Sequence, residues 1–134
     1  MIILMRRSAL TAALIGLFAT LASQSFAGMQ DYEFQLVESE VKKGDGTIIA
    51  ARLVNKGSGK AVPDAVIAAK RIDMAPDGMA DMAGRIEQLP STEPGVYRFK
   101  ANLSMQGSWQ LSLAAKVQGE NGTVESKLVL KVLP

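Results

Sequence analysis

Three methionines and three aspartates stand close together in the segment DMAPDGMADM, residues 73–82. The methionines are Met74, Met79 and Met82, and a fourth, Met105, follows in the short segment SMQG. Thioether sulfur is a soft ligand that suits Cu(I), and by extension Ag(I), and hard cations prefer oxygen. These four methionines are therefore a candidate metal site for Cu(I) or Ag(I).

The three aspartates of the same segment have two interpretations. In the first, Asp77 and Asp81 add a negative potential that favours a cation, while Pro76 and Gly78 shape the loop. In the second, the carboxylates of Asp73, Asp77 and Asp81 only cap turns and keep the loop soluble. A calcium site is excluded, because the segment lacks the D-x-D-x-D-G ladder of ligands.

The methionines also have a second interpretation, as packing residues. Methionine commonly fills gaps in hydrophobic cores and on adaptable binding surfaces. Met74 continues the apolar phase of the residues before it, and Met105 is close enough in sequence to Trp109 to cover the core beside it. For Trp109 itself we expect a place in the core, and the alternative is the wall of a small-molecule pocket.

Most catalytic chemistry is excluded by composition, since the chain contains no cysteine and no histidine. A Ser-His or Cys-His pair, a zinc site of Cys and His ligands, and cytochrome or type-I copper centres all need those residues. The 13 carboxylates remain, but no pair of them is singled out as an acid and a base. We expect a protein that is not an enzyme.

The N-terminus has the pattern of a secretory signal peptide. Arg6 and Arg7 precede an apolar run at 8–22, and Ser25-Phe26-Ala27 supplies a small-x-small cleavage pattern. The run is shorter than the ~20 residues that span a bilayer. We therefore expect residues 1–27 to be a signal peptide, 28–134 to be one periplasmic domain, and the mature chain to have no membrane span. The alternative is an uncleaved N-terminal anchor.

Removal of this segment changes the charge balance. The chain has 15 Lys and Arg against 13 Asp and Glu, and two of the cations are Arg6 and Arg7. Residues 28–134 therefore carry equal numbers of both signs. Because phosphate binding needs a basic surface, we expect no nucleic-acid partner.

Beyond residue 31 the sequence alternates apolar and polar residues, with Gly- and Pro-rich turns at short intervals. This predicts an immunoglobulin-like antiparallel β-sandwich, with a small barrel as the alternative and no helix of ordinary length. About seven strands are expected, at 32–39, 47–55, 65–74, 83–89, 96–103, 108–117 and 124–133.

Several local features can be predicted as well. Residues 65–74 are apolar enough for a central strand, residues 44–46 read as a turn, and Asn121-Gly122 is a strong hairpin signal. Two strands should turn one face inward, with the side chains Tyr97, Phe99, Ala101 and Leu103 on the first and Trp109, Leu111, Leu113, Ala115 and Val117 on the second.

Part of this pattern resembles the YtkA-like/FixH-like domain family of exported bacterial proteins. The resemblance covers roughly residues 60–134. It rests on a Met-Pro-x-Met-type loop, a Gly-x-Tyr pair and a Gly-x-Trp pair, matched here by Met74, Pro76, Met79 and Met82, by Gly95 and Tyr97, and by Met105, Gly107 and Trp109. Many relatives place a histidine near the loop and this chain has none, which disfavours Cu(II) and leaves a thioether-only site.

The resemblance implies a periplasmic β-sandwich that accompanies heavy-metal efflux of the RND type or copper-oxidase assembly. The expected function is thus capture of Cu(I) or Ag(I) and transfer to a periplasmic or membrane partner in an efflux or assembly complex. Two alternatives stay open. One is a metal-free interaction module that docks on an envelope complex by a strand edge or by the Met loop, and the other is a small-molecule binding sandwich.

Overall fold

A computed structural model describes residues 29–134, so the signal peptide predicted for residues 1–27 lies outside the described residues. Strands dominate the described part, and the two helical segments are single 3-10 turns. In chain order the elements are η2 (Met29–Asp31), β1 (Tyr32–Leu36), β2 (Glu40–Lys42), β3 (Gly44–Asn55), β4 (Val66–Met74), η3 (Ala75–Asp77), β5 (Met79–Gly84), β6 (Ile86–Leu89), β7 (Val96–Leu103), β8 (Gly107–Lys116) and β9 (Val124–Leu133).

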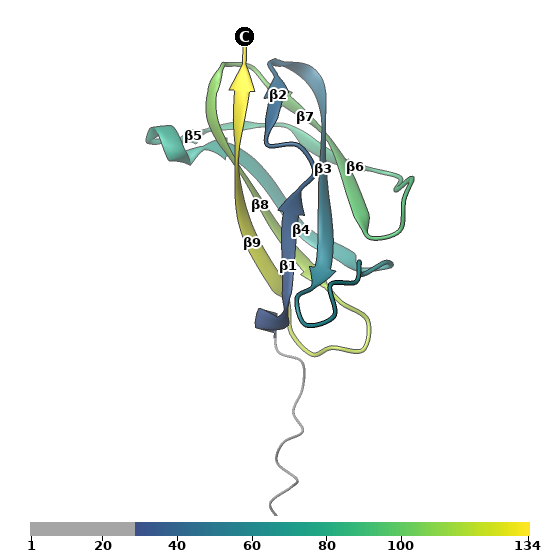
Figure 1. Cartoon of the computed structure of the whole chain (residues 1–134). Helices are drawn as coiled ribbons and strands as arrows, with labels where there is room; N and C mark the ends of the chain where they lie inside the picture. The colour runs from purple at the N-terminus through teal and green to yellow at the C-terminus, as the bar shows by residue number, and fades with distance from the viewer. Residues whose placement is uncertain (1–28) are drawn as a thin grey trace, which may run out of the picture.

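Two sheets pack face to face (Figure 1). One has four strands in the order β1-β3-β7-β6, and the other has five in the order β2-β9-β8-β4-β5. All pairs are antiparallel except β2 with β9, which is parallel. The predicted β-sandwich is confirmed, with a mixed second sheet.

The strand count differs from the predicted seven for two reasons. Residues 40–42 form a short strand beside the end of β9 that no sequence pattern predicts. The strand predicted at 83–89 is in fact two, because the chain leaves the five-stranded sheet after Gly84 and joins the four-stranded sheet at Ile86. Arg85 lies at this crossing, where its carbonyl accepts a 2.9 Å hydrogen bond from the Asn102 amide.

Two turn predictions need correction. Residues 44–46 lie inside β3, where the register with β7 shifts between Asp45 and Thr47. Gly46 has a φ of 118° there, so the turn-type residues mark a β-bulge within a continuing strand. The hairpin at Asn121-Gly122 exists, but its connection runs over residues 117–123 and is not a two-residue turn.

The expected central position of residues 65–74 is only partly correct. β5 pairs with β4 at Ile72, Asp73 and Met74, so these three residues have strands on both sides. Residues 66–71 pair with β8 alone among the strands of the described chain. Val66, the first residue of β4, is 59% exposed.

Apolar side chains from both sheets fill the space between them. The inward faces predicted for β7 and β8 are confirmed, since every residue named for them is buried. The largest side chains that are fully buried include Trp109, Phe99, Ile49 and Leu53. With no disulfide available, burial of this apolar surface is the main stabilising contribution.

The Gly-x-Tyr pair, Gly95 and Tyr97, holds the connection between β3 and β4 against this core. The Tyr97 hydroxyl donates to the Val62 carbonyl at 2.6 Å and accepts from the Ala65 amide at 2.9 Å. Burial raises the pKa of Tyr97, although the hydrogen bond from the Ala65 amide acts in the opposite direction. Gly95 has a φ of 83°, and a Cβ there would lie 2.4 Å from the Ala61 Cβ, so this close approach requires glycine.

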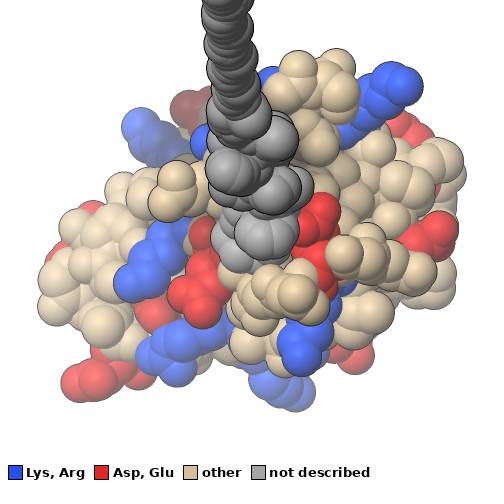
Figure 2. Space-filling model, turned by 90° about the horizontal axis from the view of Figure 1, so that it is seen from below, with Lys and Arg blue, Asp and Glu red and all other residues tan. Residues whose placement is uncertain are grey.

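Charged side chains of both signs are mixed on the surface. Figure 2 looks at the end of the domain near η2, and Lys and Arg alternate with Asp and Glu over the part that grey atoms leave visible. On this face the two signs largely offset one another, in keeping with the equal numbers of cations and anions in residues 28–134.

Candidate functional site

The methionine-bearing connection between β4 and β5 projects from the sandwich, at the left of Figure 1. We call residues 74–82 the Met tip. η3 forms its turn, with Pro76 at the start and Gly78 at the end in the left-handed conformation, at a φ of 76°. The Gly78 amide donates to the Ala75 carbonyl at 2.8 Å, which closes the turn. Pro76 and Gly78 therefore shape this loop, as expected from the sequence.

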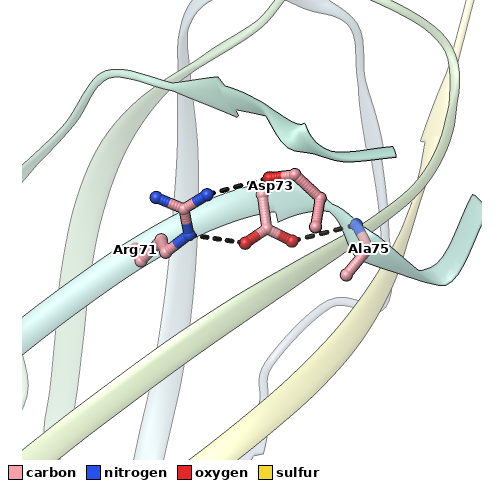
Figure 3. A network of polar contacts seen from close by, with 4 residues as sticks. Arg71, Asp73 and Ala75 are labelled. Atoms are coloured by element: carbon pink, nitrogen blue, oxygen red, sulfur yellow. Dashed lines mark hydrogen bonds and ion pairs between the residues drawn. The ribbon is translucent and has the colours of Figure 1, made fainter. Parts of the chain in front are cut away.

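The base of the Met tip is held by a buried carboxylate. Asp73 is 4% exposed, and its Oδ2 accepts a 2.7 Å hydrogen bond from the Nε of Arg71 (Figure 3). Its Oδ1 accepts from the Ala75 amide at 2.9 Å. Arg71 also donates through Nη2 to the Ala80 carbonyl at 2.8 Å, so one guanidinium ties β4 to β5. Asp73 therefore has a structural role.

A second aspartate fastens the Met tip to the turn between β7 and β8. Asp77 Oδ2 accepts a 2.9 Å hydrogen bond from the Ser108 amide. η3 consequently lies against the start of β8, which brings the two methionine-bearing connections to one end of the sandwich. Asp77 is thereby engaged in a hydrogen bond, although both it and Asp81 are exposed residues.

The four candidate methionines fall into two groups. Met74 is 1% exposed and belongs to the core, whereas Met79, Met82 and Met105 are 37%, 38% and 40% exposed. Large apolar side chains at such exposure offer contact surface and, in methionine, accessible sulfur. An ion or a protein in solution can therefore reach Met79, Met82 and Met105 but not Met74.

Two of the four are direct neighbours across a strand pair. Met74 and Met79 are register partners in the β4–β5 ladder, and opposite residues in an antiparallel pair have Cβ atoms ~5 Å apart. Met82 is not placed by this pairing, because the ladder passes from Met79 to Ala83 and leaves residues 80–82 bulged outward.

Met105 approaches from the neighbouring turn. The indole Nε1 of Trp109 donates to the Met105 carbonyl at 2.9 Å, which fixes the turn over the core. A Cβ on Gly107 would lie 2.8 Å from the Met74 Cε and 2.6 Å from Asp77 Oδ2. The turn that carries Met105 thus packs directly against Met74.

Trp109 is a core residue, as expected, with 1% of its surface exposed. The wall of a small-molecule pocket needs exposed aromatic surface, which this side chain does not offer. The role of Gly107 could not be predicted from the sequence. The only indication of it was the place of Gly107 in the Gly-x-Trp pair. The pair joins the two methionine-bearing connections, because glycine permits the close approach and tryptophan anchors the turn.

Within residues 29–134 no three carboxylates gather in a way that could hold an ion. In the same residues, no helix has the length and hydrophobicity to cross a bilayer.

Comparison with known proteins gives the family. The profile of the YtkA-like family matches residues 26–114, a span that includes the Met tip, Gly95, Tyr97, Gly107 and Trp109. The chain belongs to the YtkA-like family. This membership agrees with the expectation of an accessory domain.

Solved structures add little to this. The chain is similar to the ZirS C-terminal domain, at 11% sequence identity and a TM-score of 0.44, over 92% of this chain and 80% of that one. This likeness is too distant to bear on function. No curated protein matches the chain significantly.

Proposed function

We propose that the YtkA-like domain is a periplasmic accessory protein that binds Cu(I) or Ag(I) transiently at the Met tip and passes it to an efflux or assembly partner. It performs no catalytic turnover. The observation that supports this is that Met79, Met82 and Met105, each more than one-third exposed, lie on two connections that a hydrogen bond joins at one end of the sandwich.

The chemistry of the tip suits capture and release. Thioethers bind a soft ion without giving up a proton, so the site would keep its affinity at a mildly acidic pH. Because the three sulfurs are exposed, a partner protein can replace them one at a time. Met74 lies beside Met79 and can contribute a fourth sulfur only if the tip opens, since it is 1% exposed.

The test is an anaerobic titration of the purified protein with Cu(I), in competition with a chromogenic Cu(I) chelator. We expect one ion per chain in the parent. The variant Met79→Leu/Met82→Leu/Met105→Leu should lose at least about tenfold in affinity, because leucine keeps the volume and removes the soft ligand.

A matched control is Met29→Leu, because residue 29 belongs to η2, which precedes β1 and lies at the other end of the domain from β5 (Figure 1). It should bind as the parent does. Equal and weak binding by the parent and the triple variant would contradict the metal function.

A metal-free interaction module is the second candidate, and one observation favours it. Within the described residues, 66–71 of β4 have no strand on the side away from β8, which leaves an edge that an extended segment can extend. The exposed tip offers apolar contact surface to the same partner. Failure of the Cu(I) titration would make this candidate the leading one.

A further inference from the structure

The methionines of the Met tip differ greatly in access to solvent. Met79, Met82 and Met105 are 37–40% exposed, and Met74 is 1% exposed although it is the register partner of Met79. Oxidation of a thioether requires an oxidant to reach the sulfur, so the exposed three are open to it and Met74 is shielded.

The hydrogen bonds that hold the tip in place do not involve sulfur. They include the bonds of Arg71 to Asp73 and to the Ala80 carbonyl, the bond of the Ala75 amide to Asp73, and the bond of the Ser108 amide to Asp77. An oxygen added to an exposed sulfur leaves all of them intact. The space around Met74 is different, since its Cε lies against Gly107 so closely that a Cβ has no room there.

We propose that Met79, Met82 and Met105 form a reversible oxidation site for two-electron oxidants of the hypohalous-acid class. In hypochlorous acid, the sulfur lone pair attacks oxygen, the S–O bond forms and the O–Cl bond breaks. Chloride leaves and the hydroxyl proton passes to water, giving one sulfoxide per methionine. Return to the thioether requires an enzyme of the methionine sulfoxide reductase class, with separate activities for the two sulfoxide epimers.

Oxidation changes what the tip can bind. A sulfoxide presents a hard, polar oxygen where the thioether presented soft sulfur, so affinity for Cu(I) falls. This consequence rests on the proposed function, whereas the pattern of oxidation does not. The oxidation site would make metal capture sensitive to oxidants while the fold stays intact.

The experiment treats the purified protein with increasing amounts of hypochlorous acid and follows each methionine by peptide mass spectrometry. We expect sulfoxide at Met79, Met82 and Met105 at least about tenfold faster than at Met74. The melting temperature should stay within about 2 °C of the untreated protein while these three react. Treatment with sulfoxide reductases of both epimer specificities should restore the parent mass.

Two variants serve as controls. Met79→Leu/Met82→Leu/Met105→Leu should take up correspondingly less oxygen, with Met74 still protected. Gly107→Ala should expose Met74 and raise its rate toward that of the other three. Oxidation of Met74 as fast as the rest in the parent, or unfolding in step with the first sulfoxides, would overturn the proposal.

The outcomes also separate this inference from the proposed function. Selective, reversible oxidation in a protein that binds no Cu(I) before treatment supports the oxidation site and rejects the metal function. Tight Cu(I) binding by a protein in which Met74, Met79, Met82 and Met105 all oxidise at one rate supports the metal function and rejects the oxidation site.

Discussion

Replacing Gly107 with alanine should destabilise the domain by about 2–4 kcal/mol and detach the Met tip from the turn that carries Met105. Gly107 has a φ of 138°, which L-residues rarely adopt. The new Cβ would also lie 2.6 Å from Asp77 Oδ2 and 2.8 Å from the Met74 Cε. Both atoms end flexible side chains, so the expected response is displacement of the tip. Urea unfolding measures the loss.

Gly119→Ala separates the two causes. Gly119 also has a positive φ, 87°, but a Cβ there would meet nothing within 4 Å. Its cost is conformational only, about 1–2 kcal/mol. The larger loss in Gly107→Ala reports the displaced contacts, and that variant alone should bind Cu(I) more weakly. Equal losses of unfolding free energy in the two variants would mean that the close packing of Met74 against Gly107 does not contribute to stability.

Replacing Trp109 with alanine should cost about 3–5 kcal/mol, the largest loss expected from any single substitution at this end of the molecule. Trp109 is the largest fully buried side chain, and its removal leaves a cavity between the sheets. Since domains of this size are stable by about 5–15 kcal/mol, this loss is a large fraction of the free energy of unfolding. Far-UV circular dichroism follows unfolding without the chain's single tryptophan as a probe.

Trp109→Phe keeps an aromatic ring in the core and removes the indole N–H that bonds the Met105 carbonyl. It should cost less than the alanine variant, about 1–2 kcal/mol, and should loosen the Met105 turn. A Trp109→Ala variant within about 1 kcal/mol of the parent would contradict a core role and return Trp109 to consideration as a binding residue.

The sandwich and its inward faces could be predicted because alternation of apolar residues directly reports which side of a strand is buried. On β7 the predicted inward residues, such as Phe99 and Leu103, are all in the core. The crossing at Arg85 could not be predicted, since nothing in the sequence of residues 83–89 marks the point at which the chain changes sheets. A change of sheet is decided by partners distant in sequence, here Asn102.

The candidate site was predictable in composition and not in arrangement. Thioether-bearing residues can be read from the sequence, and the two connections do meet at one end of the sandwich. The burial of Met74 follows from its register on β4, and the engagement of Asp73 and Asp77 in hydrogen bonds follows from tertiary contacts. The apolar phase of β4 indicates the burial of Met74, but no periodicity in the sequence shows that Met79, Met82 and Met105 are exposed.

The central claim is that the exposed sulfurs of the Met tip hold Cu(I), and X-ray absorption at the copper edge tests it most directly. The protein loaded with one equivalent of Cu(I) should show a first coordination shell made of sulfur, and Met79→Leu/Met82→Leu/Met105→Leu should lose it. A shell of oxygen or nitrogen alone, or the same shell in parent and variant, would contradict the claim.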